Sequence, residues 1–572
     1  MTNAEIVELL DDTIACMELM EVNSFKINAW RNLSQVVEKA SQPIRAMQEE
    51  EKKSMFSRNM FVVIQSILET GTFPERDSLL AEIPPGVKSM MRINGIGPKK
   101  VAYLWKEAGI TTLTELKEAC DRSLLSQYKG FGLKLQETIR QGIDFLESVE
   151  GCCLMHQGDA IAAHLEKDWK AIGLNGERTG DLATRHEVVR TIEFLFPMIQ
   201  REAVMAWANS NPGLQIHLEK SGPCHFTAWL VKPEVWIRLH FAYPEGFEKQ
   251  RFVLNSNDAH WAQASQKGIP LYARWKSAGY ASEEELYTQL GLSFIDPELR
   301  GSGFEWEADF GSRSQFLVKW EDLKGCIHNH SHWSDGKNTL AEMAKACKER
   351  GWQYFGIADH SRSAQYANGL SEDRVFSQWA AIDDLNKTWT DFRILKGIES
   401  DILPDGRLDY SESILAGFDY VVASVHSGMK MDKNTATARL IKAIEHPATR
   451  ILGHCSGRLL LRRPGYPLDY DKIIDACVAN QVAIELNAHP ARLDMDWENL
   501  ARALERGAWI SINPDAHDIS GLDLMRYGVW LARKAGAGKT QVLNALNTEE
   551  ILSFFQRSSH STPLAYVENL SS

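Results

Sequence analysis

The sequence predicts a multidomain protein with an α-helical N-terminal region, an α+β middle region and a C-terminal distorted (β/α)7 barrel. Its 572 residues are too many for one hydrophobic core, so several domains are expected. Apolar residues recur at helical spacing over 4–20, 26–40 and 52–69. From about residue 322, short apolar runs alternate with helical segments, which is typical of βα units that close into a barrel.

The composition is that of an ordinary globular protein, with 44% hydrophobic and 24% charged residues. The net charge of −13 argues against nucleic acid covering the whole surface, but it allows a local basic groove or bound cations. There is no run of about 18 apolar residues, and the acidic start does not resemble a signal peptide. Nine cysteines without CxxC spacing indicate free thiols in a reducing cytosol. We therefore expect a cytoplasmic monomer without membrane contact.

The N-terminal region contains a motif suited to binding the DNA backbone. Ile93-Asn-Gly95-Ile-Gly97-Pro-Lys99-Lys100-Val101 stands between two amphipathic segments and resembles a helix-hairpin-helix. Its glycines permit a tight turn, and the amides at the following helix N-terminus can hold a phosphate. Lys129-Gly130-Phe-Gly132-Leu-Lys134 repeats this pattern more weakly. The expected DNA contacts are Gly95, Gly97, Lys99, Lys100, Gly130, Gly132 and Lys134. The alternative is a purely structural hairpin.

Seven short apolar runs of the C-terminal half are expected to form the strands of a parallel barrel. They are 326–329, 354–358, 393–398, 420–425, 450–453, 482–486 and 509–512, with helices such as 340–350 and 469–479 between them. In such a barrel the loops after the strands meet at one rim, where active sites are built.

Histidine or carboxylate residues of the kinds that bind metal lie on or just after six of these strands. His328 and His330 stand two positions apart and therefore point to the same side of a strand. A single histidine is more often a packed or surface residue, but nine such residues at this recurrence indicate a metal site. The expected ligands are His328, His330, Asp335, His360, Glu399, His426, His454, Asp515 and His517. After the sixth strand comes Asn487-Ala-His489, to which no role is assigned.

The mixture of imidazole and carboxylate donors suits Mn²⁺, Zn²⁺ or Fe²⁺ better than Mg²⁺. We expect two or three divalent ions, with Mn²⁺ first and Zn²⁺ or Fe²⁺ as alternatives. Clustered ions acidify water and polarise phosphoryl oxygens, so the predicted reaction is phosphoester hydrolysis. Arg458 is a candidate for a bidentate contact with a phosphate.

The order of these parts resembles the bacterial family X DNA polymerases fused to a PHP (polymerase and histidinol phosphatase) domain. The resemblance covers nearly the whole length, including 281–287 and 297–300. All nine expected ligands match PHP motifs, in which Glu399 is the bridging carboxylate and Arg458 ends the motif that begins at His454. The resemblance implies a helical 8-kDa-like domain (1–82), a fingers-like domain (83–150), a palm-like domain (151–240), a thumb-like domain (241–318) and a PHP domain (319–572).

The palm-like segment departs from this family. Family X palms carry a GS motif followed by two aspartates, and a third aspartate on a later strand. In the best register Thr191 and Glu193 replace the first two aspartates, Trp236 replaces the third, and Asp181 replaces the serine. Two-metal phosphoryl transfer needs carboxylates that bridge the ions, which these residues do not supply. The sequence therefore predicts a polymerase core without polymerase activity.

The predicted function is a metal-dependent phosphoesterase that trims 3′ ends of gapped or nicked DNA in repair, as a 3′-5′ exonuclease or 3′-end processing enzyme. Glu399 and Arg458 are its expected catalytic residues. One alternative is an active gap-filling polymerase with a proofreading PHP nuclease, which requires a different carboxylate triad in the palm. Another is a small-molecule phosphatase of the histidinol-phosphate type. A non-catalytic scaffold for DNA ends is a fourth hypothesis.

Overall fold

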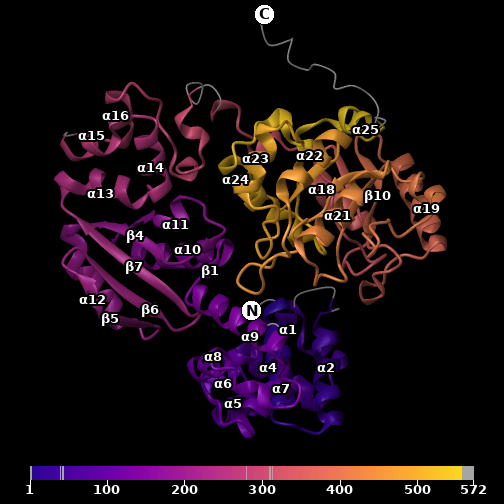
Figure 1. The fold of residues 1–572 in the computed structure, drawn as a ribbon, viewed down its shortest axis with the longest axis horizontal. Coiled ribbons are helices and arrows are strands. Elements are labelled where there is room, and N and C mark those ends of the chain that lie inside the picture. The colour runs from indigo at the N-terminus through magenta and orange to yellow at the C-terminus, as the bar shows by residue number, and fades with distance from the viewer. Residues whose placement is uncertain are drawn as a thin grey trace, which may run out of the picture. The chain divides into compact units, whose positions relative to one another are not determined.

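The computed structural model describes residues 3–38, 40, 44–93, 95–277, 280–307, 311 and 314–556. The chain forms two compact units, Met1–Glu150 and Gly151–Ser572, and its elements are labelled in Figure 1. The predicted fold class is confirmed: the N-terminal unit is helical, and the second unit contains a mixed α/β region followed by a nearly closed parallel barrel.

Helices build the N-terminal unit. They are α1 (Asn3–Leu19), α2 (Ser24–Glu38), α3 (Glu49–Met55), α4 (Arg58–Thr70), α5 (Pro74–Glu82), α6 (Pro85–Met90), α7 (Pro98–Lys106), α8 (Leu113–Asp121) and α9 (Leu133–Ser148). The helices predicted over 4–20 and 26–40 correspond to α1 and α2. A single helix over 52–69 is wrong, because the backbone of Phe56 is extended and Ser57 is the N-cap of α4.

A five-stranded sheet forms the middle region, in the order β2-β4-β7-β6-β5 (Figure 1). Its strands are β2 (Glu177–Thr179), β4 (Ile192–Pro197), β5 (Leu214–Gly222), β6 (His225–Leu230) and β7 (Val235–Ala242). Only the β4–β7 pair is parallel. Trp169 of α10 (Met155–Ala171) packs on one face, with its ring centroid 4.7 Å from that of Phe194 and 5.0 Å from that of Phe196. The opposite face carries Glu193 and Trp236.

In the described part of the chain directly after this sheet, the α-helices are α13 (Phe247–Leu254), α14 (Asp258–Gln266), α15 (Leu271–Ser277) and α16 (Glu283–Gln289). Their core encloses charged side chains that are all paired. Arg300 forms a buried ion pair with Glu283. His260 lies between Glu305, at 3.2 Å from Nδ1, and Tyr287, at 3.0 Å from Nε2. These partners offset the cost of burying the polar groups.

The C-terminal region contains a sheet of seven parallel strands in sequence order. They are β8 (Gly325–Cys326), β9 (Tyr354–Ile357), β10 (Arg393–Asp401), β11 (Tyr420–Ser424), β12 (Thr449–Leu452), β13 (Ala483–Asn487) and β14 (Ile510–Asn513). A parallel bridge between Asn329 and Ala516 joins the chain after β8 to the chain after β14, which nearly closes the barrel. All seven strands lie at or within a few residues of their predicted positions.

Helices surround the barrel and include α18 (Leu340–Glu349), α19 (Glu372–Thr388), α21 (Lys433–Ile444), α22 (Tyr470–Asn480), α23 (Trp497–Glu505) and α24 (Met525–Lys534). The helices predicted over 340–350 and 469–479 are therefore confirmed as α18 and α22. Because every strand runs in the same direction, all the strand C-termini meet at one rim.

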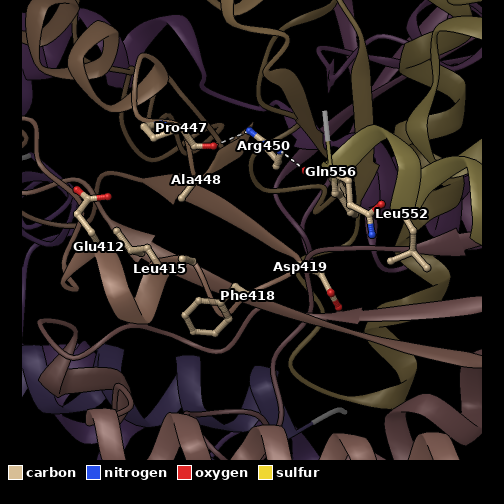
Figure 2. Close-up of a pocket in the computed structure, with 11 residues that line it drawn as sticks. Glu412, Leu415, Phe418, Asp419, Pro447, Ala448, Arg450, Leu552 and Gln556 are labelled. Carbon is tan, nitrogen blue, oxygen red and sulfur yellow. Dashed lines mark hydrogen bonds between the residues drawn. The ribbon is translucent and has the colours of Figure 1, made fainter. Parts of the chain in front are cut away.

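A cavity of about 340 Å³ lies at the opposite end of the barrel, where β11 and β12 begin (Figure 2). Leu415, Phe418, Arg450 and Leu552 line it. Arg450 donates hydrogen bonds to the carbonyls of Pro447 and Phe555 across this end. The cavity contains none of the expected metal ligands, so the catalytic candidates lie elsewhere.

Candidate metal centre

The nine expected ligands converge at the C-terminal rim of the barrel. Each comes from a strand end or from the loop that follows. His328 and His330 follow β8, Asp335 lies in the next loop, His360 follows β9, Glu399 is on β10, His426 follows β11, His454 follows β12, and Asp515 and His517 follow β14. We call these nine residues the metal-ligand cluster. Its members come from distant parts of the sequence, as the strand period predicted.

Glu399 is the centre of this cluster. Its carboxylate oxygens lie 2.9 Å from His360 Nδ1, 3.0 Å from His454 Nε2 and 3.1 Å from His426 Nε2. The Nε2 atoms of His328 and His330 lie 3.4 and 3.6 Å away. A buried carboxylate surrounded by five imidazoles has the arrangement of a group that bridges metal ions.

Three subsets of the cluster bring their ligand atoms within 4.8 Å of one another. The subsets are His330, Asp335, His360 and His517; His328, His330 and Asp515; and His360, Glu399 and His426. His330 and His360 each belong to two subsets. Each subset offers the donor atoms that a divalent metal ion takes.

Buried nitrogen atoms in the cluster support metal binding. Within the part of the chain that the structure describes, His328 Nε2, His330 Nδ1 and His454 Nδ1 are buried and have no hydrogen-bond partner. An unsatisfied buried polar atom is costly, and a bound metal satisfies a lone pair of this kind. The donor set of imidazoles and carboxylates fits divalent ions of the Mn²⁺, Fe²⁺ and Zn²⁺ class.

The cluster contains side chains in two kinds of ionisation state. Burial opposes the protonation of His426 and His517, but the carboxylates beside them raise the pKa of His426 to about 10 and that of His517 to about 9, so metal binding would displace their protons. Burial and the neighbouring histidines lower the pKa of His330 to about 3, so its imidazole is neutral. Burial opposes the ionisation of Glu399, but the histidines around it, His426 foremost, hold the pKa of its carboxyl well below its usual range. Neutral imidazole and ionised carboxylate are the forms that bind metals.

A second layer of carboxylates orients the histidines. His328 Nδ1 lies 2.6 Å from Glu485 Oε1, and the backbone amide of His454 donates to Glu485 Oε2 at 2.7 Å. His426 Nδ1 contacts Asp401. A carboxylate at Nδ1 leaves Nε2 free to face the metal. Neither Glu485 nor Asp401 was predicted, although Asp401 stands two residues after Glu399 on β10 and therefore points to the same side of the strand.

Comparison with known proteins identifies the family. The model described as "PHP domain" matches residues 327–489, and the model described as "SAM-like Helix-hairpin-helix tandem" matches residues 87–144. The chain is 33% identical to the DNA polymerase/3′-5′ exonuclease PolX of Bacillus subtilis over 573 residues, covering 97% of this chain and 100% of that protein. The chain belongs to the PolX family. The resemblance to family X polymerases with a PHP domain is thus confirmed.

Shorter relatives of this PolX-family chain match only part of it. A probable phosphatase of Vibrio atlanticus is 30% identical over 221 residues, which cover 36% of this chain and 83% of the relative. The probable phosphatase YcdX of Escherichia coli is 27% identical over 201 residues, covering 33% of this chain and 77% of the relative. Across the residues that the structure describes, no helix combines the length and the apolar character that crossing a membrane requires.

Among the residues that the structure describes, the polymerase-like sheet of this PolX-family chain holds no group of carboxylates able to bind a metal ion. Glu193 Oε2 lies 3.1 Å from His240 Nε2, and Glu193 Oε1 lies 3.5 Å from Arg238 Nη1. Trp236 packs against Trp229, with 4.7 Å between ring centroids, and Lys220 Nζ lies 3.7 Å above the Trp236 ring. Among the described residues, the three groups of side chains able to hold a metal all lie in the barrel. Thr191 stands just before β4, where it offers a hydroxyl and no charge.

The helix-hairpin-helix glycines adopt the conformations that their motifs require. Gly95 has φ +95° and Gly130 has φ +90°, while Gly97 and Gly132 are the N-caps of α7 and α9. A Cβ added at Gly97, Gly130 or Gly132 would meet no described atom within 4 Å, so a ligand can approach these backbones. The side chains of Lys99 and Lys134 are exposed beside them. Asn94, within the first motif, lies outside the described residues.

The structure places Arg458 beside the cluster rather than in it. Arg458 Nη2 lies 2.9 Å from Glu187 Oε1, and Arg458 Nε donates to the carbonyl of Arg492 at 2.9 Å. By contrast, Arg492 Nε lies 3.9 Å from the ligand Asp515, and the side chain of Arg492 is 22% exposed. Arg492 is therefore a cation that the sequence reasoning missed. The sequence pointed to Arg492 only by its position, three residues after His489 in the loop that follows a predicted strand.

Proposed function

We propose that this PolX-family chain is a metal-dependent phosphoesterase that removes nucleotides or blocking groups from 3′ ends of DNA during repair. One observation carries the proposal: the nine members of the metal-ligand cluster meet at one rim, with Glu399 within 3.6 Å of five histidines. The relative from Bacillus subtilis is named a 3′-5′ exonuclease, which supports DNA as the substrate.

The chain's own residues would bind the ions and hold the scissile phosphate. Bound divalent ions supply an acidified water and neutralise charge on the phosphoryl group. Glu399 and the other eight residues of the cluster would hold the ions. Hydrolysis joins the oxygen of water to phosphorus and breaks the bond to the 3′ oxygen of the preceding nucleotide. The products are a nucleoside 5′-monophosphate and a new 3′ hydroxyl. Mn²⁺ is the proposed ion, because imidazole and carboxylate donors are mixed.

Arg492 is our candidate for the cation that contacts the phosphate, and Arg458 is not, because its guanidinium contacts Glu187 and main-chain carbonyls. Tyr366 is a second substrate contact at this rim. It is 74% exposed, and its ring centroid lies 6.2 Å from that of His360. An exposed aromatic ring beside a metal site is suited to stacking on a nucleobase.

The N-terminal unit would bind the DNA backbone through its two hairpins. Gly97 and Gly132 open the helices α7 and α9, and Lys99, Lys100 and Lys134 add positive charge. Such contacts are independent of sequence, as an enzyme acting on gapped, nicked or 3′-ended DNA requires. Cysteines such as Cys16, Cys120 and Cys477 are free thiols, which supports a reducing cytoplasm as the location. A monomer accounts for the proposal without a second copy.

The test uses 5′-labelled gapped DNA with Mn²⁺, with and without deoxynucleotides, and compares wild type, Glu399→Ala and Glu193→Gln. We expect wild type and Glu193→Gln to shorten the strand equally and never to extend it, while Glu399→Ala leaves it intact. Extension that survives Glu399→Ala would establish an active polymerase site and overturn our assignment of the palm. If the Glu399→Ala variant still shortens the labelled DNA strand, the metal-ligand cluster of the barrel is not the site of hydrolysis.

A second candidate is a phosphatase for small phosphomonoesters, because several relatives are named probable phosphatases. Hydrolysis of p-nitrophenyl phosphate, measured beside the DNA assay, distinguishes the two. A specificity constant far higher for the small ester than for a 3′ end would favour the phosphatase.

A further inference from the structure

Glu187 lies between α11 (Gly180–Ala183) and β3 (Val188–Val189), in the polymerase-like region, yet it contacts the barrel. We propose that Glu187 is a positioning residue for the metal centre, because it fixes Arg458 and thereby the loop that carries the ligand His454. This proposal rests on the function proposed above. Through Glu187, the polymerase-like region would support hydrolysis in the barrel, and this role does not require the carboxylates of a polymerase site.

Arg458 joins three parts of the chain. Its Nη2 forms the 2.9 Å ion pair with Glu187 Oε1 and also donates to the carbonyl of Leu493. Its Nε donates to the carbonyl of Arg492 at 2.9 Å. The guanidinium therefore ties the polymerase-like region to the loop after β13, which contains Arg492.

The loop after β12 depends on these same contacts. The amides of Ser456 and Gly457 donate to the carboxylate of Asp494 at 3.1 and 3.0 Å, next to the carbonyls that Arg458 holds. His454 begins this loop, four residues before Arg458. The position of the His454 ring at Glu399 is therefore set by a loop whose far end is fixed by Glu187.

The Glu187–Arg458 pair is largely withdrawn from water, since the two side chains are 14% and 15% exposed. Removing the carboxylate leaves a desolvated guanidinium without its counter-ion, which strongly disfavours the present loop conformation. We expect Arg458 to move toward water and to release the carbonyls of Arg492 and Leu493.

Other contacts hold the two regions together, so loss of this pair does not separate them. Met155 of α10 is 1% exposed and belongs to the barrel's hydrophobic core. The guanidinium of Arg185 lies 3.9 Å above the Trp530 ring, and Lys534 Nζ donates to the carbonyl of Thr184 at 2.9 Å. A Glu187 variant therefore tests the position of the loop and not the assembly of the regions.

The experiment titrates Mn²⁺ into the full-length, metal-free protein and measures free Mn²⁺ by electron paramagnetic resonance. It compares wild type, Glu187→Gln, Arg458→Met, the double variant and Glu193→Gln. Glu193 is the matched control, because it is 16% exposed and also contacts an arginine, but within its own sheet. Thermal unfolding of each variant confirms that it is folded.

We expect Glu187→Gln to weaken the binding of at least one Mn²⁺ about tenfold, and to lower kcat with little change in KM for DNA. The double variant should bind Mn²⁺ more tightly than Glu187→Gln, because it removes the unpaired charge. Wild-type Mn²⁺ affinity in Glu187→Gln, or an equal loss in Glu193→Gln, would overturn the proposal. If wild type proves inactive on DNA, the proposed function fails, whereas the Mn²⁺ titration still decides the role of Glu187.

Discussion

His328 Nδ1 and Glu485 Oε1 lie 2.6 Å apart, and both side chains are completely buried. Glu485 also accepts hydrogen bonds from the amide of His454 at 2.7 Å and from the side chain of Asn513 at 2.9 Å. One carboxylate of β13 therefore positions two ligands that belong to different strands. Replacing a side chain of such an outer layer typically lowers metal affinity by about 10- to 100-fold.

We predict that Glu485→Gln weakens Mn²⁺ binding by about 10- to 100-fold, because the amide cannot orient the His328 ring as the carboxylate does. Titration of the metal-free protein with Mn²⁺ measures this effect. Glu505→Gln, on the exposed face of α23, is the control and should bind Mn²⁺ as wild type does. Unchanged affinity in Glu485→Gln would show that the contact does not tune the site.

Metal should stabilise the folded protein through Glu399. At a Mn²⁺ concentration of about 100 times its dissociation constant, binding to the native state alone adds about 2.7 kcal/mol to the unfolding free energy. We therefore expect Mn²⁺ to raise the unfolding temperature of wild type by a few degrees, and a chelator to reverse this. Scanning calorimetry of Glu399→Ala should show a much smaller rise. An equal rise would mean that the ion binds elsewhere.

Tyr366 should select 3′ ends that carry a base. Tyr366→Ala is expected to lower kcat/KM about tenfold on DNA with a normal 3′ nucleotide, because stacking on one base is lost. The same variant should be unaffected on DNA whose 3′-terminal residue is abasic, since no base is present to stack. Phe376→Ala, at a side chain 50% exposed on α19, provides the control. Equal losses on both substrates would refute stacking.

Lys99 and Lys100 should bind phosphates rather than bases. Replacing both by alanine is expected to weaken binding of gapped DNA of any sequence and to reduce the slope of log affinity against log salt by about 2. Fluorescence anisotropy at several salt concentrations measures both quantities. Lys117→Ala is the matched control, because Lys117 already contacts Asp144 at 2.8 Å and Glu147 at 2.7 Å. A slope that does not change would exclude the hairpin from the DNA contact.

Lys534 should make stability depend on pH. Its side chain is completely buried, and burial lowers its pKa to about 8, below the ordinary 10.5. Between these values the unfolded chain binds the additional proton, so stability attributable to Lys534 rises with pH and is lost as pH falls through 8. Relative to Lys534→Met, wild type should gain up to about 3 kcal/mol of unfolding free energy between pH 7.5 and pH 10. Denaturant unfolding of both proteins at both pH values measures this gain. If the difference in unfolding free energy between wild type and Lys534→Met is the same at both pH values, the prediction is wrong.

The barrel and the convergence of the metal-ligand cluster could be predicted because both follow from local sequence. Each strand is a short apolar run, and each member of the cluster stands at a strand end or in the loop that follows, so a regular spacing places the side chains at one rim. The absence of the palm carboxylates stays a prediction of the sequence, made because Thr191 and Trp236 cannot bridge two ions.

The contacts between distant segments could not be predicted. Glu485 and Asp401 are ordinary strand carboxylates in the sequence, and only the barrel brings them to His328 and His426. Arg458 looked like a phosphate ligand because its partner, Glu187, lies in another region of the chain. No pattern in either segment indicates that the two side chains meet.

The members of the metal-ligand cluster are synthesised one after another, and two of them come late. Asp515 and His517 follow β14, the last strand of the barrel, and Asn329 pairs with Ala516 between them. A chain still on the ribosome therefore lacks these two of the nine members of the cluster until nearly all of it has been synthesised. Under the proposed function, ions could meet the complete cluster only after the last strand has joined the first, so a product truncated before β14 would bind them with an incomplete cluster.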